Sequence, residues 1–132
     1  MTGIAMVGTG MWAPRLAAAA ERAGLELVTC FSRDDARRAE FAERFGCGAA
    51  ASLEEAIEHP GVEGVVLVTP NDAHEEQALA CAERGRHVLV EKPIAESVEA
   101  GERMRSSPSA SAAGRLRPSR TQSKTPAWRG SC

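Results

Sequence analysis

A lysine between a glutamate and a proline stands late in this 132-residue sequence. In "HVLVEKPIAESVEAGERM" (87–104), an apolar run ends at Val90. Lys92 comes just after it, with Glu91 before the lysine and Pro93 behind it. A charged side chain in this place is typical of a catalytic position, because ligands bind at the carboxyl ends of the strands in open sheets. The chain ends at Cys132, which raises the question of where the rest of such a site would come from.

A glycine-rich segment, "GTGMWA", occupies residues 8–13 between an apolar run and an alanine-rich stretch. Gly8 permits a tight turn, Gly10 lets backbone N–H groups approach a pyrophosphate, and Ala13 keeps the following helix close to the sheet. Met11 and Trp12 complete the turn and are included in the candidate site. Two alternatives remain open from these residues: a turn without a ligand, and a related fold that binds S-adenosylmethionine.

A second polar segment follows the next apolar run, "LELVTCF". A cofactor-binding domain normally places an acid here for the ribose diol of adenosine, but this chain has Ser32 and Arg33. A hydroxyl and a guanidinium suit a 2′-phosphate, which favours NADP over NAD. The alternative is that Arg33 is a solvated surface residue and that Asp34 only caps a helix.

These segments lie at the junctions between predicted strands and predicted helices, which alternate along the chain. Short apolar runs predict strands, and segments with a 3.6-residue period predict the helices between them. Strand and helix in alternation predict an α/β fold with a doubly wound parallel sheet and right-handed crossovers. Ser52, Asn71 and Ser97 are candidate helix caps. The predicted strands cover residues 3–8, 25–31, 47–50, 63–69 and 87–91.

The last part of the chain differs in composition from the first. Residues 1–100 carry 17 acidic and 9 basic side chains, whereas residues 101–132 carry one acidic and seven basic ones. Residues 106–132 contain seven serines and three prolines, and Leu116 is their only large aliphatic residue. Such a segment cannot bury enough surface to offset its ordering entropy, so we predict a disordered basic tail. The bias resembles an out-of-frame reading of GC-rich coding sequence or a gene fragment.

The remaining composition excludes several classes of protein. The spacing of Cys30, Cys47, Cys81 and Cys132 indicates neither a disulfide framework nor a metal site, so we expect reduced thiols. No apolar run approaches the roughly 18 residues of a membrane span, and no secretory leader is present, so a cytoplasmic protein is expected. The tail has a single aromatic residue and no folding motif, which argues against a nucleic-acid-binding arm.

With "TPNDAH" (69–74) and "FAERFG" (41–46), the segments above resemble the glucose–fructose oxidoreductase, inositol dehydrogenase and MocA (Gfo/Idh/MocA) family of NAD(P)-dependent oxidoreductases. The pieces match in order and spacing over roughly residues 1–105. Taken singly, Asn71 could be a helix cap and His74 a helix-surface histidine. The resemblance implies that residues 1–105 form a Rossmann domain that binds NADP or NAD.

The resemblance also implies roles for individual residues. Lys92 would contact the reacting hydroxyl or carbonyl of a sugar or polyol, and its ammonium could stabilise charge that develops on that oxygen. Glu91 would lie by the nicotinamide ribose, and Pro93 would fix the turn, through a cis bond if that isomer is adopted. The nicotinamide half of the site would be lined by Thr69, Pro70, Asn71 and His74.

Family members continue after this domain into a second α/β domain that holds most of the substrate pocket. No such segment follows in this sequence, so we expect a cofactor domain that is inactive on its own. The alternative is a stand-alone NADP-binding module without catalysis. The substrate and the oligomeric state depend on the absent domain.

Overall fold

The computed structural model describes residues 2–92, 95–106 and 116–118. Its sheet is parallel throughout, with the strand order β3-β2-β1-β4-β5-β6. The strands are β1 (Gly3–Val7), β2 (Glu26–Phe31), β3 (Gly48–Ala49), β4 (Gly64–Leu67), β5 (His87–Val90) and β6 (Leu116–Pro118). The helices are α1 (Ala13–Arg22), α2 (Asp35–Phe45), α3 (Leu53–Glu58), α4 (Asn71–Glu83) and α5 (Val98–Ser106). The predicted doubly wound α/β fold of Rossmann type is confirmed.

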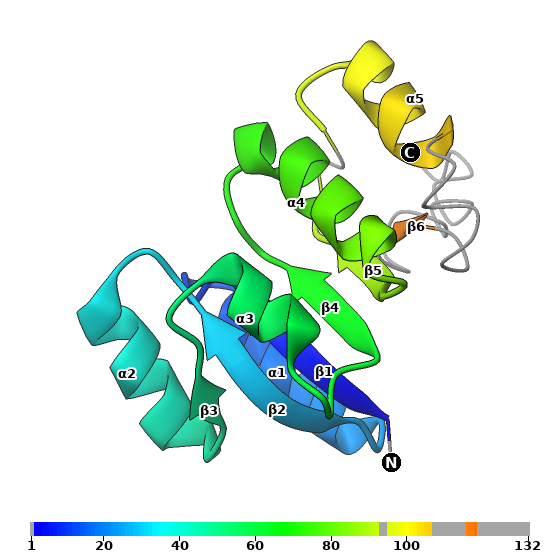
Figure 1. Cartoon of the computed structure of the whole chain (residues 1–132). Coiled ribbons are helices and arrows are strands. Elements are labelled where there is room, and N and C mark those ends of the chain that lie inside the picture. The colour runs from blue at the N-terminus through cyan, green and yellow to red at the C-terminus, as the bar shows by residue number, and fades with distance from the viewer. Residues whose placement is uncertain (1, 93–94, 107–115, 119–132) are drawn as a thin grey trace, which may run out of the picture.

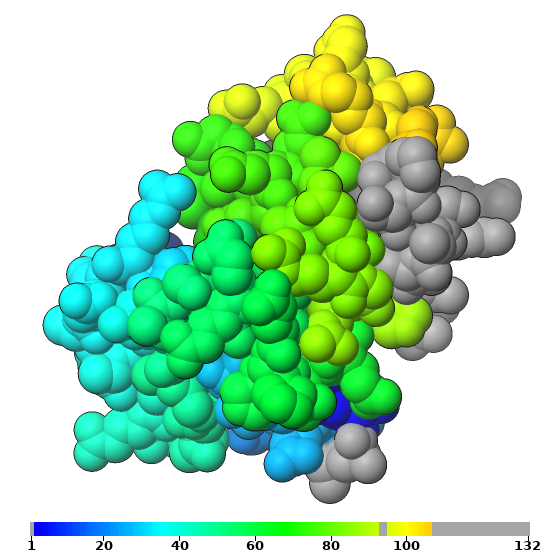
Figure 2. Space-filling model, viewed as in Figure 1, coloured from blue at the N-terminus to red at the C-terminus, as the bar shows by residue number. Residues whose placement is uncertain are grey.

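Helices cover both faces of the sheet, which explains why its central strands are apolar along their whole length (Figure 1). On one face, α1 and α2 pack through Ala13, Ala17 and Phe41 against β1 and β2. On the other face, α3, α4 and α5 pack through Ile57, Cys81 and Met104. Figure 2 shows α5 lying against α4 at the surface, where Arg103 of α5 forms an ion pair with Glu75 of α4.

The helix ends follow the sequence signals with one exception. The Asp34 carboxylate accepts from the Arg37 N–H, and the Ser52 and Ser97 hydroxyls accept from N–H groups three residues later. Asn71, however, is the first residue of α4, and Pro70 occupies the N-cap position without a side-chain hydrogen bond. The prediction that Asn71 caps α4 is therefore wrong.

Four strands end at the same level of the sheet. In the parallel register, Val7 of β1 pairs with Phe31 of β2 and Leu67 of β4, and Leu67 pairs with Val90 of β5. The residues that follow these strands therefore meet at one edge. The strand order reverses between β1 and β4, and this is the position where open α/β sheets bind ligands.

The segment that we predicted to be disordered contributes a strand at the edge beyond β5. There, β6 pairs in parallel with β5, with Val88 opposite Leu116 and Val90 opposite Pro118. The composition argument considered only side-chain burial, whereas pairing at a sheet edge uses backbone groups, and proline is tolerated on an edge strand. Ser106, the first residue of the predicted tail, ends α5, whereas residues 107–115 and 119–132 and Pro93 lie outside the described residues. Within the described ranges, no helix is long and apolar enough to cross a membrane.

Candidate functional site

The turn after β1 requires glycine at its first position. Gly8 has a φ of 97°, and a Cβ atom built on it would lie 2.7 Å from the carbonyl carbon and oxygen of Val68. The Gly8 N–H donates to the Phe31 carbonyl at 2.8 Å, so the turn is tied to the end of β2 as well. Gly8 therefore lets the chain turn tightly between the ends of β2 and β4.

The second glycine of the turn is needed for a different reason. A Cβ atom on Gly10 would meet no protein atom within 4 Å, so the fold itself tolerates a side chain there. The space beside Gly10 is open at the N-terminus of α1, where Pro14 occupies the first turn and Ala13 is fully buried. Open space at a helix N-terminus is what an approaching phosphate requires.

The two residues between Gly10 and α1 point outward. Met11 and Trp12 are 84% and 54% exposed, and the guanidinium of Arg15 lies 4.9 Å from the centre of the Trp12 ring. Such exposed apolar side chains beside a glycine turn leave a surface for contact with a ligand or with another domain.

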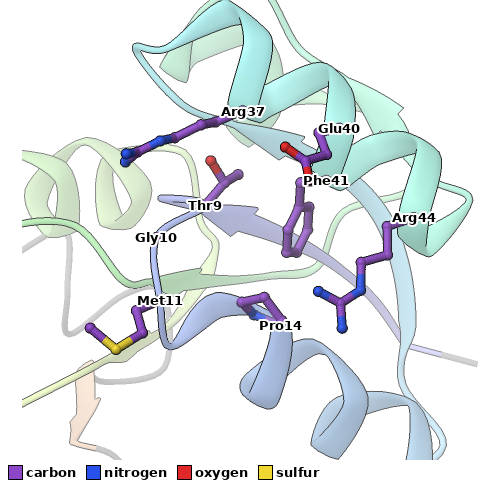
Figure 3. A pocket seen from close by; sticks show the side chains of 8 residues that line it. All are labelled: Thr9, Gly10, Met11, Pro14, Arg37, Glu40, Phe41 and Arg44. Atoms are coloured by element: carbon purple, nitrogen blue, oxygen red, sulfur yellow. The ribbon is translucent and has the colours of Figure 1, made fainter.

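A cavity of about 520 Å³ lies between the glycine turn and α2 (Figure 3). Figure 3 shows Arg37 and Arg44 at its two ends, with Glu40 and Phe41 between them. The cavity combines two cations, one anion and an apolar floor. Its complete lining consists of Thr9, Gly10, Met11, Pro14, Arg37, Glu40, Phe41 and Arg44.

One polar atom in the cavity wall has an unmet hydrogen-bonding capacity. The Thr9 hydroxyl oxygen is buried and has no hydrogen-bond partner among the described residues. A buried hydroxyl costs free energy unless a partner satisfies it, so this atom fits a site that receives a polar group from a ligand. Thr9 and the open backbone at Gly10 together fit the phosphate and ribose groups of a dinucleotide.

The segment after β2 reaches the same region. The Ser32 hydroxyl accepts from the Asp34 N–H at 3.3 Å, which leaves its own hydrogen available for donation. The Arg38 guanidinium donates to the Ser32 carbonyl at 3.0 Å and forms an ion pair with the Asp35 carboxylate at 2.8 Å. Arg37 has a looser contact, 3.7 Å from the Asp34 carboxylate, and its side chain is 69% exposed.

Arg33 is exposed and is not among the residues that line the cavity. Sequence reasoning named Arg33 and missed Thr9, Arg37 and Arg44. No spacing in the sequence singles out Arg37, because Arg33 lies before the helix, which begins at Asp35.

The turn after β4 is held from within α4. The Thr69 hydroxyl donates to the side-chain oxygen of Gln77, and the Thr69 carbonyl lies 2.8 Å from Nε2 of His74. His74 is only 1% exposed, so the reading as a helix-surface histidine is wrong. Pro70 and Asn71 are exposed at this end of the sheet.

The segment after β5 lies beside this turn. The Glu91 N–H donates to the Leu67 carbonyl at 3.0 Å, which continues the pairing of β5 with β4. The Lys92 N–H donates to the Glu91 carboxylate at 3.0 Å, and the Lys92 side chain is exposed. The described residues contain no group of three or more metal-ligating side chains.

Comparison with known proteins identifies related sequences for most of the chain. The profile described as "Oxidoreductase family, NAD-binding Rossmann fold", of the Gfo/Idh/MocA proteins, matches residues 2–109. A 4-carboxy-2-hydroxymuconate-6-semialdehyde dehydrogenase of Sphingobium is 41% identical over 75 residues, which are 56% of this chain and 24% of the dehydrogenase. An NADP(+)-dependent scyllo-inositol 2-dehydrogenase of Bacillus subtilis is 34% identical over 106 residues, 79% of this chain and 32% of that enzyme.

A solved structure agrees in fold. The WlbA dehydrogenase of Chromobacterium violaceum, in complex with NADH and UDP-GlcNAcA, superposes with a TM-score of 0.81 at 32% identity. The match covers 89% of this chain and 34% of WlbA. The chain thus spans about a quarter to a third of the length of these three proteins.

Proposed function

Because this chain belongs to the Gfo/Idh/MocA family of oxidoreductases through its NAD-binding Rossmann domain, we propose that it binds a nicotinamide dinucleotide across the ends of β1, β2, β4 and β5. The observation that carries the proposal is that these four strands end at the same level of the sheet. The glycine turn, Ser32, Thr69 and Lys92 therefore lie at one edge. The pyrophosphate would lie at Gly10 and the N-terminus of α1.

The adenosine half would lie towards α2, and we favour NADP as the cofactor. Ser32 has a hydroxyl hydrogen to donate, Arg33 is exposed at the surface, and Arg37 stands at the cavity mouth near Thr9. No acid competes with a 2′-phosphate at the position after Phe31, and guanidinium groups form strong charge-assisted hydrogen bonds to phosphate. The similarity to an NADP(+)-dependent scyllo-inositol dehydrogenase is consistent with this choice.

The nicotinamide half would lie towards β4 and β5. Glu91 would face the nicotinamide ribose, and the turn of Thr69, Pro70 and Asn71 would border the ring. The bound nicotinamide supplies the hydride chemistry. The exposed ammonium of Lys92 would donate a hydrogen bond to the substrate oxygen, which becomes more negative as a carbonyl is reduced.

Sugars or polyols are the proposed substrates of a protein that contains this domain. The inositol dehydrogenase similarity supports this class. For the 132-residue chain we propose cofactor binding alone, because this chain spans only about a quarter to a third of the relatives' length. A non-catalytic NADP-binding module remains the alternative, and turnover separates the two.

The test is calorimetric titration of the purified chain with NADPH, in the native form and as Gly10→Val. We expect Gly10→Val to lose most of the affinity, because its side chain would occupy space that is open in the protein and required by the pyrophosphate. The same space explains why this substitution should leave thermal stability nearly unchanged.

Gly101→Val provides a matched control. Gly101, in α5, likewise has no atom within 4 Å of a built Cβ, but it lies away from the proposed site. Equal NADPH affinity in the native chain and Gly10→Val would contradict the proposed binding mode. Absence of any NADPH or NADH binding by the native chain would contradict the function itself.

A further inference from the structure

Two residues of one helix hold Thr69 at both its backbone and its side chain. Thr69 directly follows Val68, whose N–H still donates to β1 through the Val7 carbonyl at 2.8 Å. His74 contacts the Thr69 carbonyl and Gln77 accepts from the Thr69 hydroxyl. His74 and Gln77 are three residues apart, so they share the face of α4 that looks back towards the turn.

The hydrogen-bonding direction follows from the chemistry of the groups. A carbonyl oxygen can only accept a hydrogen bond. The Nε2 atom of His74 therefore carries the hydrogen and donates a hydrogen bond of 2.8 Å to the Thr69 carbonyl. His74 is 1% and Gln77 7% exposed, which shields both bonds from water. Hydrogen bonds of this kind are costly to break, because the buried partner is left unsatisfied.

The start of α4 lacks the usual means of fixing a helix entrance. Its N-cap is Pro70, which has no side-chain donor or acceptor, and no side-chain cap bond is formed. The bonds from His74 and Gln77 satisfy none of the N–H groups of the first turn, as a cap would, but they fix the residue before Pro70. The exposed Pro70–Asn71 segment is anchored from behind by Thr69.

We propose that His74 is a positioning residue that holds the Thr69–Asn71 turn in the conformation that receives the nicotinamide half of the cofactor, without contacting the cofactor itself. This inference rests on the proposed function and goes beyond it, because the resemblance implied His74 as part of the lining. With only 1% of its surface exposed, His74 offers a ligand almost no contact area, but it bonds to the turn that borders the site.

The expected effect is confined to one half of the ligand. When a turn is held in its binding conformation for a smaller fraction of time, the apparent affinity falls by that fraction. The adenosine half binds at β2 and the glycine turn, away from α4, and should be unaffected.

The experiment compares NADPH with 2′-phospho-ADP-ribose, which lacks only the nicotinamide, by calorimetry on the full chain. His74→Leu removes the donor while filling the space, and His74→Gln keeps an amide N–H near the position of Nε2. We expect the NADPH dissociation constant to rise at least about fivefold in His74→Leu and to stay within about twofold in His74→Gln. The dissociation constant of 2′-phospho-ADP-ribose should stay unchanged in both variants.

His87→Ala is the control for losing a histidine, since His87 is exposed at the opposite end of β5. Hydrogen exchange supplies a second readout: residues 69–72 should exchange faster in His74→Leu, with β1 and β2 unaffected. If His74→Leu fails to fold, His74→Asn, whose amide is too short to reach Thr69, replaces it with the same expectation.

Three results would overturn the inference. One is an NADPH affinity in His74→Leu equal to that of the native chain. Another is a parallel loss of affinity for both ligands, which indicates general destabilisation. A third is equal native affinity for both ligands, which means that the turn receives no nicotinamide. If the native chain binds neither ligand, the proposed function has failed instead.

Discussion

At the scale of single residues, the neighbouring side chains of Arg37 and Arg38 differ in how firmly other groups hold them. Arg38 is held by Ser32 and Asp35, whereas Arg37 reaches the cavity with only a loose contact to Asp34. A guanidinium that is already paired gains little from a ligand, so Arg37 is better placed than Arg38 to bind an added phosphate.

Arg37→Met should reduce the preference for NADPH over NADH. The loss of a charge-assisted contact costs about 1.5–3 kcal/mol, which corresponds to about tenfold or more in NADPH affinity, while NADH affinity should change little. Arg33→Ala should act in the same direction if Arg33 moves to the phosphate. Both ratios are measured by competitive titration.

Arg22→Met, in the last turn of α1 and outside the cavity lining, is the control for removal of a charge. An unchanged NADPH to NADH ratio in both Arg37→Met and Arg33→Ala would refute the assignment of the 2′-phosphate to this region. A change in Arg44→Met alone would place the phosphate at the other end of the cavity.

The cysteines also differ by environment, although all three described ones are free thiols. Burial raises the pKa of Cys81 to about 12. Hydrogen bonding to Cys47 and burial raise the pKa of Cys30, and the same bond lowers the pKa of Cys47. A lower pKa means more reactive thiolate at a given pH.

We therefore expect iodoacetamide to alkylate Cys47 before Cys81 and Cys30 between about pH 7 and pH 9, in a Cys132→Ser background. Because the pKa of Cys47 is depressed, its reaction should persist to lower pH than that of Cys81. Peptide mass spectrometry measures each rate, and alkylation in urea should abolish the differences. Faster reaction at Cys81 than at Cys47 in the folded chain would contradict this ordering.

At the scale of elements, α2 supplies the cavity wall and begins with a local signal. The Asp34 carboxylate accepts from the Arg37 N–H at 3.0 Å, so the cap also orders the turn that carries Arg37. Phe41, 4% exposed, anchors the same helix to β2 and β1. A polar cap and an apolar stripe together position one face of the candidate site.

Asp34→Ala should lower the free energy of unfolding by about 1 kcal/mol, the usual cost of a lost N-cap. Urea denaturation followed by circular dichroism measures this change. Glu43→Ala, an exposed change near the other end of α2, should alter stability by much less. Equal effects of the two substitutions would show that the cap contributes nothing specific.

At the scale of the whole molecule, the described domain presents its site at an open edge. Lys92, Met11 and Trp12 are exposed there. In the proposed full-length arrangement, a substrate domain would cover this edge and hold the reacting carbon against the nicotinamide. Positioning of this kind supplies several kcal/mol of barrier lowering in enzymes, and the described domain by itself does not provide it.

We accordingly expect the 132-residue chain to bind cofactor but to show no useful turnover with a panel of sugars and polyols. The measurement is nicotinamide absorbance with NADP, NAD, NADPH and NADH, at substrate concentrations up to solubility. Clear turnover that disappears in Lys92→Ala would show that this domain alone is a sufficient catalyst and would refute the expectation.

Much of the fold could be read from the sequence because its signals are local. The apolar runs from Gly3 to Val7 and from Gly64 to Leu67 need cover on both faces, and this requirement alone indicates a parallel sheet between helices. Gly8 and Gly10 stood out because only glycine provides a tight turn and a bare backbone. Asp34 and Ser52 were recognisable as cap types because capping depends on neighbours three residues away.

Other features depended on contacts between distant segments. Arg37 rather than Arg33 lines the cavity because the packing of α2 on the sheet decides which side chains face the glycine turn. His74 is buried because α4 turns that face towards Thr69, and the pairing of β6 with β5 joins segments far apart in the chain. Periodicity predicts that a helix has an inner face, but only tertiary packing decides what that face touches.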